Sequence, residues 1–175
     1  MKHFKIVILL VFVFFAGLTW SSPGSHFKNI NSTNKIKTQT DSSKVDLDSL
    51  ISFAEKYLGT PYRYGCCTPK GFDCSGFTYF VFKHFKINVP RSSRDYFSYG
   101  KEVSKEECQK GDIICFQGTN PKIKRIGHVG IVISEKGEPI KFIHASSSRK
   151  NYCVMISDFT GSYYLNRFVK IKRVL

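Results

Sequence analysis

The residue best suited to act as a reactive group is Cys74, in the segment FDCSGF at residues 72–77. Asp73 is a favourable N-cap residue, and the aromatic run over residues 77–82 is typical of a buried helix. We therefore expect Cys74 in the first turn of that helix, at the positive end of its dipole. A thiolate is the nucleophilic form of cysteine, and a helix N-terminus is one environment that lowers a thiol pKa. Cys74 is thus the candidate nucleophile.

A nucleophilic cysteine requires a base, and the chain offers five histidines. His3 and His26 lie in the N-terminal region, and His84 lies in an apolar helical stretch where a structural or surface role is expected. His128 stands between glycines at the start of a strand-like segment, and His144 ends a second one. We expect His128 to take the thiol proton and His144 to orient its second ring nitrogen.

Each of these residues also has a structural interpretation. A lone cysteine at a helix start more often packs in the core than reacts, and a single histidine in a strand is usually structural. The combination of Asp73, Cys74 and Gly76 with the glycine-flanked His128 favours the catalytic interpretation.

The six cysteines are too few and too irregularly spaced for a disulfide scaffold. Adjacent Cys66 and Cys67 cannot bond to each other without strain, but either could pair with one of the three later cysteines in an oxidising compartment. With Cys74 free, at least one other cysteine stays unpaired, and the connectivity is open. A zinc site that includes His128 would lack paired Cys-x₂₋₄-Cys spacing. We expect no metal and no cofactor. The later cysteines are Cys108, Cys115 and Cys153.

The elements that must position these residues change in type along the chain. Apolar residues first recur at helical spacing and later occur in short β-rich runs. This order, in which helices precede strands, is typical of an α+β fold, with N-terminal helices packed on an antiparallel sheet. The predicted helices cover residues 47–58, 74–85 and 92–99, and the predicted strands cover 112–117, 128–134, 139–144, 152–156 and 168–174.

The N-terminal residues 1–21 have the order of a secretory signal peptide: lysines, an uncharged apolar run, then small and polar residues. The run is shorter than the roughly 18 apolar residues of a spanning helix, although an uncleaved membrane anchor is an alternative. Residues 22–44, rich in Ser, Thr, Asn and Lys, are predicted to form a flexible tether. Residues 45–175 remain for one domain.

The composition is strongly basic, with 27 Lys and Arg against 13 Asp and Glu and a formal charge of +14. Such a chain suits an anionic partner such as a cell envelope, although a solvated basic surface explains the charge equally well. Nucleic acid is not expected, because no recognised nucleic-acid motif occurs and an exported protein rarely meets its genome. A hydrophobic fraction of 42% excludes a long disordered tail, and no collagen-like or coiled-coil pattern is present.

Several segments, taken in order, resemble the NlpC-type cell-wall cysteine peptidases. The resemblance extends over about residues 47–174, and a series of ordered motifs is far more specific than a lone cysteine. The matching segments are GTPYRYG at 59–65, DCSGF at 73–77, VPRSS at 89–93, GDII at 111–114, GHVGIV at 127–132 and IHA at 143–145.

The resemblance implies a compact papain-like α+β fold and cleavage of peptide stems in bacterial peptidoglycan. It assigns Cys74 as nucleophile, His128 as general base and His144 as the orienting residue. It also implies that Tyr62 positions the thiol, with core packing as the alternative. The residues that it places along the substrate cleft are Asp73, Ser75 and Arg91, the last with a surface or structural salt bridge as the alternative.

The chain departs from the family pattern directly after Gly65. The family commonly has a second glycine there, whereas this chain has Cys66 and Cys67. Loss of that glycine puts the conformation of the loop, and hence the shape of the cleft, in question.

The resulting expectation is an exported peptidoglycan endopeptidase, monomeric, in the periplasm or at the cell envelope, acting on stem peptides. The resemblance favours the D-glutamyl–diaminopimelate amide bond, and the cross-link between stems is the alternative. Two other classes stay open: a non-catalytic envelope-binding module, and an acyltransferase that uses the same nucleophile. The basic surface would support peripheral association with the envelope, more weakly at high salt.

Overall fold

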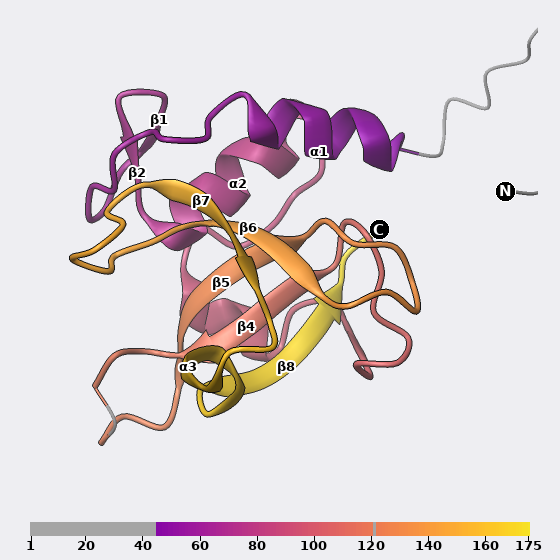
Figure 1. The fold of residues 1–175 in the computed structure, drawn as a ribbon. Coiled ribbons are helices and arrows are strands. Elements are labelled where there is room, and N and C mark those ends of the chain that lie inside the picture. The colour runs from indigo at the N-terminus through magenta and orange to yellow at the C-terminus, as the bar shows by residue number, and fades with distance from the viewer. Residues whose placement is uncertain (1–44, 121) are drawn as a thin grey trace, which may run out of the picture. The chain divides into compact units, whose positions relative to one another are not determined.

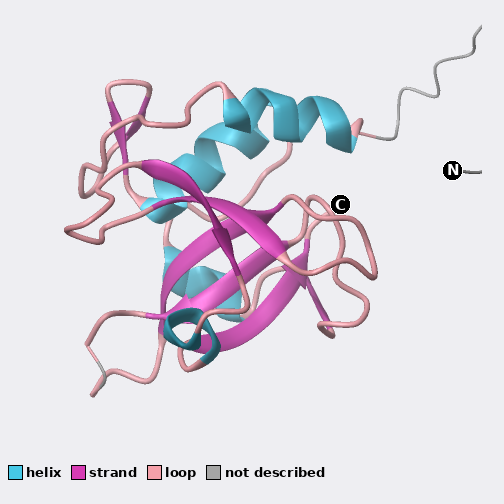
Figure 2. Cartoon of the chain, in the orientation of Figure 1, coloured by secondary structure: helices cyan, strands magenta, loops and turns pink. Residues whose placement is uncertain are grey.

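The computed structural model describes residues 45–120 and 122–175 and has two helices followed by an antiparallel sheet (Figure 1). The predicted signal peptide and tether, residues 1–21 and 22–44, lie outside the described residues. Figure 2 shows the two longer helices together on one side of the strands, with a one-turn helix at the opposite end of the sheet. The α+β prediction is confirmed. No helix in the described ranges is long and apolar enough to cross a membrane.

Helix α1, Leu47–Glu55, begins where the side chain of Asp46 accepts a hydrogen bond from the Asp48 backbone N–H. It ends earlier than predicted because the chain turns toward Gly59, which has a φ of +81°. The Gly59 N–H then donates to the Val154 carbonyl, so the end of the helix is joined to the sheet. The residues of α1 that are buried in the core are Leu50, Ile51 and Ala54.

Helix α2, Cys74–His84, starts three residues before the aromatic run and therefore includes the cysteine. Its buried face packs against α1 and against two strands of the sheet. The helix predicted over residues 92–99 is a 3₁₀ helix, η1, Ser93–Phe97. A short hairpin between α1 and α2 was not predicted; it consists of β1 (Cys67–Thr68) and β2 (Gly71–Phe72).

All five predicted strands are present, in a six-stranded antiparallel sheet of order β3-β8-β4-β5-β6-β7. The additional strand is β3, and a one-turn helix, α3 (Ser162–Leu165), precedes the last strand. The strands are β3 (Lys101–Val103), β4 (Ile113–Gln117), β5 (Ile126–Val132), β6 (Lys141–Ala145), β7 (Val154–Asp158) and β8 (Phe168–Arg173).

Alternate side chains of the strands enter two separate apolar clusters. In β4, Ile113 and Cys115 pack in the cluster that contains α1 and α2, whereas Ile114 and Phe116 pack in the second cluster. Each fully buried side chain of this size contributes about 1.5–3 kcal/mol to folding. The sheet is therefore covered on both faces at β4, which makes it a firm base for residues on neighbouring strands.

Strands β5 and β6 pair only at one end. Their register joins Ile131 to Ile143 and Val132 to Phe142, and no pair extends to residues 127–129. Since the Cys74 sulfur lies 3.9 Å from the Gly127 carbonyl, the N-terminal end of α2 lies where β5 has separated from β6. This separation gives a helix residue access to the backbone of β5.

Tyr96 in η1 leads to a prediction about stability. Its side chain is fully buried, and its hydroxyl has no hydrogen-bond partner in the described structure. Replacing a buried, unsatisfied hydroxyl by hydrogen removes a desolvation penalty, so Tyr96→Phe should raise the free energy of unfolding by about 1 kcal/mol. Urea denaturation followed by fluorescence measures the change.

The matched control is Tyr99→Phe, because the Tyr99 hydroxyl donates to the Asn88 carbonyl. That variant should lose about 0.5–1 kcal/mol. Destabilisation by Tyr96→Phe equal to that of the control would show that the Tyr96 hydroxyl has a partner after all.

Candidate active site

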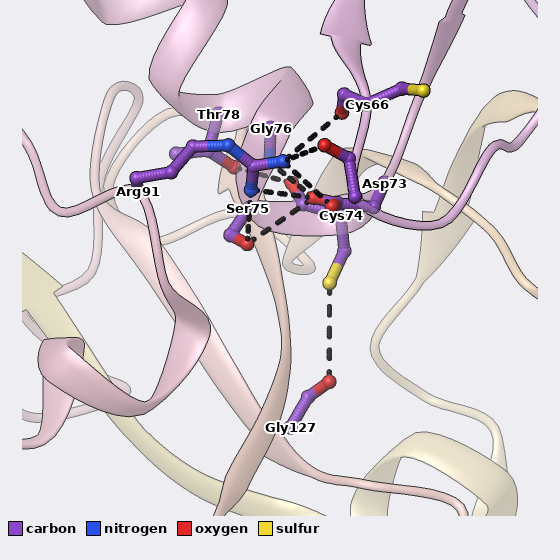
Figure 3. A network of polar contacts seen from close by, with 9 residues as sticks. Cys66, Asp73, Cys74, Ser75, Gly76, Thr78, Arg91 and Gly127 are labelled. Atoms are coloured by element: carbon purple, nitrogen blue, oxygen red, sulfur yellow. Dashed lines mark hydrogen bonds and ion pairs between the residues drawn. The ribbon is translucent and has the colours of Figure 1, made fainter.

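Asp73 determines how α2 begins. Its Oδ1 accepts a hydrogen bond from the Gly76 backbone N–H at 2.6 Å, which satisfies one of the free donors of the first helical turn. Arg91 approaches the same carboxylate with both arms of its guanidinium, Nη1 at 3.0 Å from Oδ1 and Nη2 at 2.8 Å from Oδ2 (Figure 3). A two-armed ion pair of this kind fixes direction as well as distance. The first turn of α2 is therefore held in place.

Arg91 also joins α2 to the preceding loop. Its Nη1 donates to Ser75 Oγ at 3.2 Å, and its Nη2 donates to the Gly65 carbonyl at 2.8 Å. The structural salt bridge expected as an alternative for Arg91 is thus present, with Asp73 as partner. All three predicted cleft residues, Asp73, Ser75 and Arg91, line one hollow of about 280 Å³ together with Cys74.

The backbone conformation at Cys66 does not require the glycine that the family pattern places there. Gly65 has a φ of +76°, but Cys66 is not among the described residues with positive φ, so glycine is not required there. The Cys66 carbonyl accepts the Asp73 N–H at 2.9 Å, and a Cβ on Gly76 would come within 2.1 Å of that oxygen. Gly76 is therefore the glycine that this close approach requires. All six cysteines are free thiols.

The sulfur of Cys74 projects from the first turn of α2 toward the sheet (Figure 3). It lies 3.9 Å from the Gly127 carbonyl and interacts with the Val129 backbone N–H, the two residues that flank His128 in β5. The thiol can reach this backbone because β6 is not paired with β5 at this point. Neither the Cys74 nor the Ser75 backbone N–H donates to a backbone carbonyl in the described structure; both face the Cys74 sulfur.

Burial raises the pKa of the Cys74 thiol to about 11. The nearby backbone N–H groups act in the opposite direction, as the helix-terminus argument predicts, but they are outweighed. The effect of the helix start on the thiol pKa could be predicted from the sequence, whereas the larger effect of burial could not. In the free protein the thiol is therefore protonated at neutral pH.

His128 and His144 form a direct pair. His128 Nε2 lies 2.9 Å from His144 Nδ1, and the two rings meet edge to face at 88°. Both side chains are buried, with exposed fractions of 8% and 1%. This contact leaves Nδ1 of His128 as the nitrogen free to exchange a proton with another group.

Two hydroxyl groups hold the far side of His144. Its Nε2 lies 3.0 Å from Ser157 Oγ and 3.3 Å from Tyr164 Oη. If these hydroxyls accept from His144 Nε2–H, then His144 Nδ1 accepts from His128 Nε2–H, and His128 Nδ1 carries the lone pair. Ser157 and Tyr164 could not be predicted from the sequence, because only the register of β7 and the position of α3 bring them to this ring.

Both imidazoles are neutral. Burial, together with the positive charge of Arg167, lowers the pKa of His144 to about 3. Burial first, then the neighbouring His144 and Arg167, lowers the pKa of His128 well below its usual value. A neutral His128 is able to accept a proton at physiological pH.

The structure brings the three predicted catalytic residues into one region, but it does not join all of them by hydrogen bonds. The thiol of Cys74 donates to the Gly127 carbonyl, and no hydrogen bond between that sulfur and the His128 ring occurs in the described residues. Contacts of this type are often long in a free enzyme and shorten when substrate binds. The remaining histidine of the described domain, His84, is exposed and stacks on Phe53, in agreement with a structural role.

Tyr62 lines the same hollow as Cys74 and is half-buried. Its ring packs 5.0 Å from that of Tyr152, and burial raises the pKa of its hydroxyl, so the phenol is neutral. Tyr62 therefore both packs against a neighbouring ring and lies in the same hollow as the thiol. Within residues 45–120 and 122–175, no three His, Cys, Asp or Glu side chains converge to hold a metal ion.

Several known proteins are similar to this chain in sequence and in fold. The model of the NlpC/P60 family matches residues 59–173. The murein DD-endopeptidase MepS/murein LD-carboxypeptidase of Escherichia coli K12 is 36% identical, over 75% of this chain and 65% of its own length. The gamma-D-glutamyl-L-lysine dipeptidyl-peptidase of Bacillus cereus is 30% identical, over 79% of this chain and 40% of its own.

Among solved structures, an NlpC/P60 family protein from Bacillus cereus superposes with a TM-score of 0.65 at 33% identity. The match covers 75% of this chain and 41% of that protein, so the chain spans less than half of its length. The family match includes the start of α2 and both histidines and covers well over half of the sequence. The chain belongs to the NlpC/P60 family of cysteine peptidases.

Proposed function

We propose that this protein is a peptidoglycan endopeptidase that hydrolyses an amide bond of stem peptides, with Cys74 as nucleophile, His128 as general base and His144 as orienting residue. The observation that supports it best is the place of the Cys74 sulfur, in contact with the backbone on both sides of His128. Family membership supports the reaction class.

In the first step, the Cys74 thiol leaves the Gly127 carbonyl and gives its proton to Nδ1 of His128. The sulfur then forms a bond to the carbonyl carbon of the scissile amide. The negative charge that develops on the carbonyl oxygen is stabilised by N–H groups at the start of α2 that donate to no backbone carbonyl, with that of Cys74 as the first donor.

In the second step, His128 returns the proton to the leaving amine as the C–N bond breaks. Water, deprotonated by the neutral His128, attacks the thioester and releases the acid, which regenerates the thiol. His144 keeps His128 in the required tautomer throughout. No cofactor takes part in this sequence. The three residues therefore suffice for hydrolysis.

The residues around the thiol have supporting roles in this proposal. Tyr62 closes one wall of the hollow and limits the positions open to the sulfur. Asp73, Ser75 and Arg91 line the same hollow, but their polar groups bind one another. They shape the substrate cleft chiefly by holding its walls, and Arg91 presents the edge of its guanidinium to the substrate.

The bond that we propose is the D-glutamyl–diaminopimelate amide. The gamma-D-glutamyl peptidase among the relatives supports this choice, whereas the DD-endopeptidase among them makes the cross-link between stems the second candidate. Digestion of defined muropeptides, followed by mass analysis of the products, distinguishes the two bonds.

The site of action that we propose is outside the cytoplasm, because peptidoglycan lies there. The basic composition supports peripheral attachment to anionic envelope polymers, and the protein would act as a monomer.

The first prediction of this mechanism concerns Cys74→Ala. Removal of the nucleophile should reduce the release of stem-peptide fragments from purified peptidoglycan by at least about 10³-fold. Mass spectrometry of the soluble products measures release, and circular dichroism checks folding. Cys108→Ala, which removes a buried thiol remote from the cleft, should keep full activity. Fragment release by Cys74→Ala at the rate of the parent protein would exclude the thiol mechanism.

A binding module would release no fragments from either protein, and an acyltransferase would give conjugates of higher mass instead of hydrolysed peptides. The same product analysis therefore separates the three classes.

The second prediction concerns the hydroxyls that hold His144. Removing both, in Ser157→Ala/Tyr164→Phe, should lower kcat about tenfold at nearly constant KM, equivalent to ~1.4 kcal/mol. The double variant is needed because either hydroxyl can replace the other as partner of Nε2. Imidazole ¹⁵N chemical shifts should report a mixture of tautomers in the double variant. Tyr163→Phe, at an exposed neighbouring position, is the matched control. Unaltered kcat and ¹⁵N shifts in the double variant would count against this role.

The third prediction follows from the raised pKa of Cys74. In the absence of substrate, the thiolate fraction should rise about tenfold per pH unit up to a pH near 11. The logarithm of the alkylation rate of Cys74 should therefore rise steadily from pH 7 to 10. Peptide mapping after iodoacetamide treatment isolates this cysteine from the others, and glutathione provides the reference for the reagent. A plateau that begins below pH 8 would instead indicate a thiolate–imidazolium pair.

A further inference from the structure

A second hollow continues the groove beyond the Cys74 sulfur. It has a volume of about 270 Å³ and shares part of its wall with the hollow that contains Cys74. The shared residues include Gly127, whose carbonyl contacts the sulfur. A substrate with its scissile carbonyl at Cys74 would therefore place a neighbouring residue in the second hollow. The shared residues are Tyr64, Ser93, Arg94 and Gly127.

The second hollow is positively charged. Arg94 and Arg125 both line it, and no acidic side chain does. Residues 113–134, which supply most of its wall, include no Asp or Glu. Asp95 follows Arg94 in the sequence but does not line the hollow. The field in this part of the groove therefore favours an anion.

The two guanidinium groups have no protein partner. Among the described residues, neither Arg94 nor Arg125 forms a salt bridge or a side-chain hydrogen bond, and both are exposed. Arg91, a few residues earlier, differs because both Nη atoms of its guanidinium donate to the Asp73 carboxylate. Two arginines that line one hollow and have no protein partner can bind a carboxylate, the group whose geometry matches a guanidinium.

We infer that the second hollow is a carboxylate subsite, in which Arg94 and Arg125 bind a free carboxylate of the residue beside the scissile bond. This inference rests on the proposed function, since that function defines the substrate as a stem peptide. Such peptides carry free carboxylates on D-glutamate and on diaminopimelate, one on each side of the proposed bond. Exposed Tyr64, in the wall between the two hollows, separates the bound carboxylate from the reacting carbonyl.

The test is calorimetric binding of the tripeptide L-alanyl-γ-D-glutamyl-diaminopimelate to the Cys74→Ala protein, which binds without turnover. Two analogues, one amidated on the D-glutamate α-carboxylate and one amidated on both diaminopimelate carboxylates, identify which residue supplies the bound carboxylate. One of them should bind about tenfold more weakly than the tripeptide. Arg94→Gln/Arg125→Gln, added to Cys74→Ala, should weaken tripeptide binding at least tenfold and abolish the difference between tripeptide and amide.

The matched control is Arg149→Gln, which removes the same group from an exposed position outside both hollows. It should leave both affinities unchanged. Equal affinity for the tripeptide and both amides, or absence of any binding, would overturn the inference. The comparison of the tripeptide with its two amides uses the Cys74→Ala protein with both arginines present. Misfolding of the double arginine variant would therefore not obscure the result.

Hydrolysis by the parent protein separates this inference from the proposed function. Cleavage of tripeptide and amides at equal rates would leave the endopeptidase in place and remove the subsite. Preferential binding of the carboxylate without cleavage by the parent protein would retain the subsite and remove the endopeptidase.

Discussion

The active region depends on a single buried carboxylate. Asp73 caps α2 through the Gly76 N–H, accepts both arms of Arg91 and is within 3.3 Å of the Ser75 hydroxyl. Hydrogen bonds to a charged group contribute about 1.5–3 kcal/mol each, more than neutral ones. Through Arg91 the carboxylate also fixes the Gly65 carbonyl, so the helix start and the cleft wall are set by the same interaction. The direction of the Cys74 side chain follows from that arrangement.

The sheet provides the complementary half of the site by remaining incomplete. If β5 and β6 paired along their full length, the β5 backbone at residues 127–129 would be occupied and a helix residue could not contact it. The separation of the strands leaves that backbone to the thiol, and the two histidines lie close enough to bond through their rings. A neutral thiol and two neutral imidazoles are then buried together, which avoids the cost of isolated buried charges.

Much of this could be predicted from the sequence, because several residue types have strong local preferences. An aspartate before an apolar run predicted the start of α2 and with it the position of Cys74, and the β-branched residues after His128 indicated a strand. Features that depend on tertiary structure were missed. Strand β3 has three residues and no buried alternation, and the hairpin β1–β2 is shorter still. Ser157 and Tyr164 become neighbours of His144 only through strand register, which a single sequence does not specify.

The pKa of the Cys74 thiol likewise could be predicted only in part from the sequence. The helix N-terminus is visible in the sequence, whereas burial of Cys74 depends on how two distant strands separate. Likewise, the loop after Gly65 accommodates Cys66 because the close contact there falls on Gly76, a position that only the folded chain identifies.

The buried histidine pair also makes folding sensitive to acid. Since the pKa of His144 is about 3 in the folded protein and near 6.5 in an unfolded chain, unfolding takes up a proton at any pH between these values. The contribution of this histidine to stability is complete above pH 6.5 and declines by up to about 1.4 kcal/mol per pH unit below it. His128, whose pKa is also lowered, acts in the same direction. Acidification below pH 6.5 would therefore lower the free energy of unfolding, through two side chains that lie at the centre of the active site.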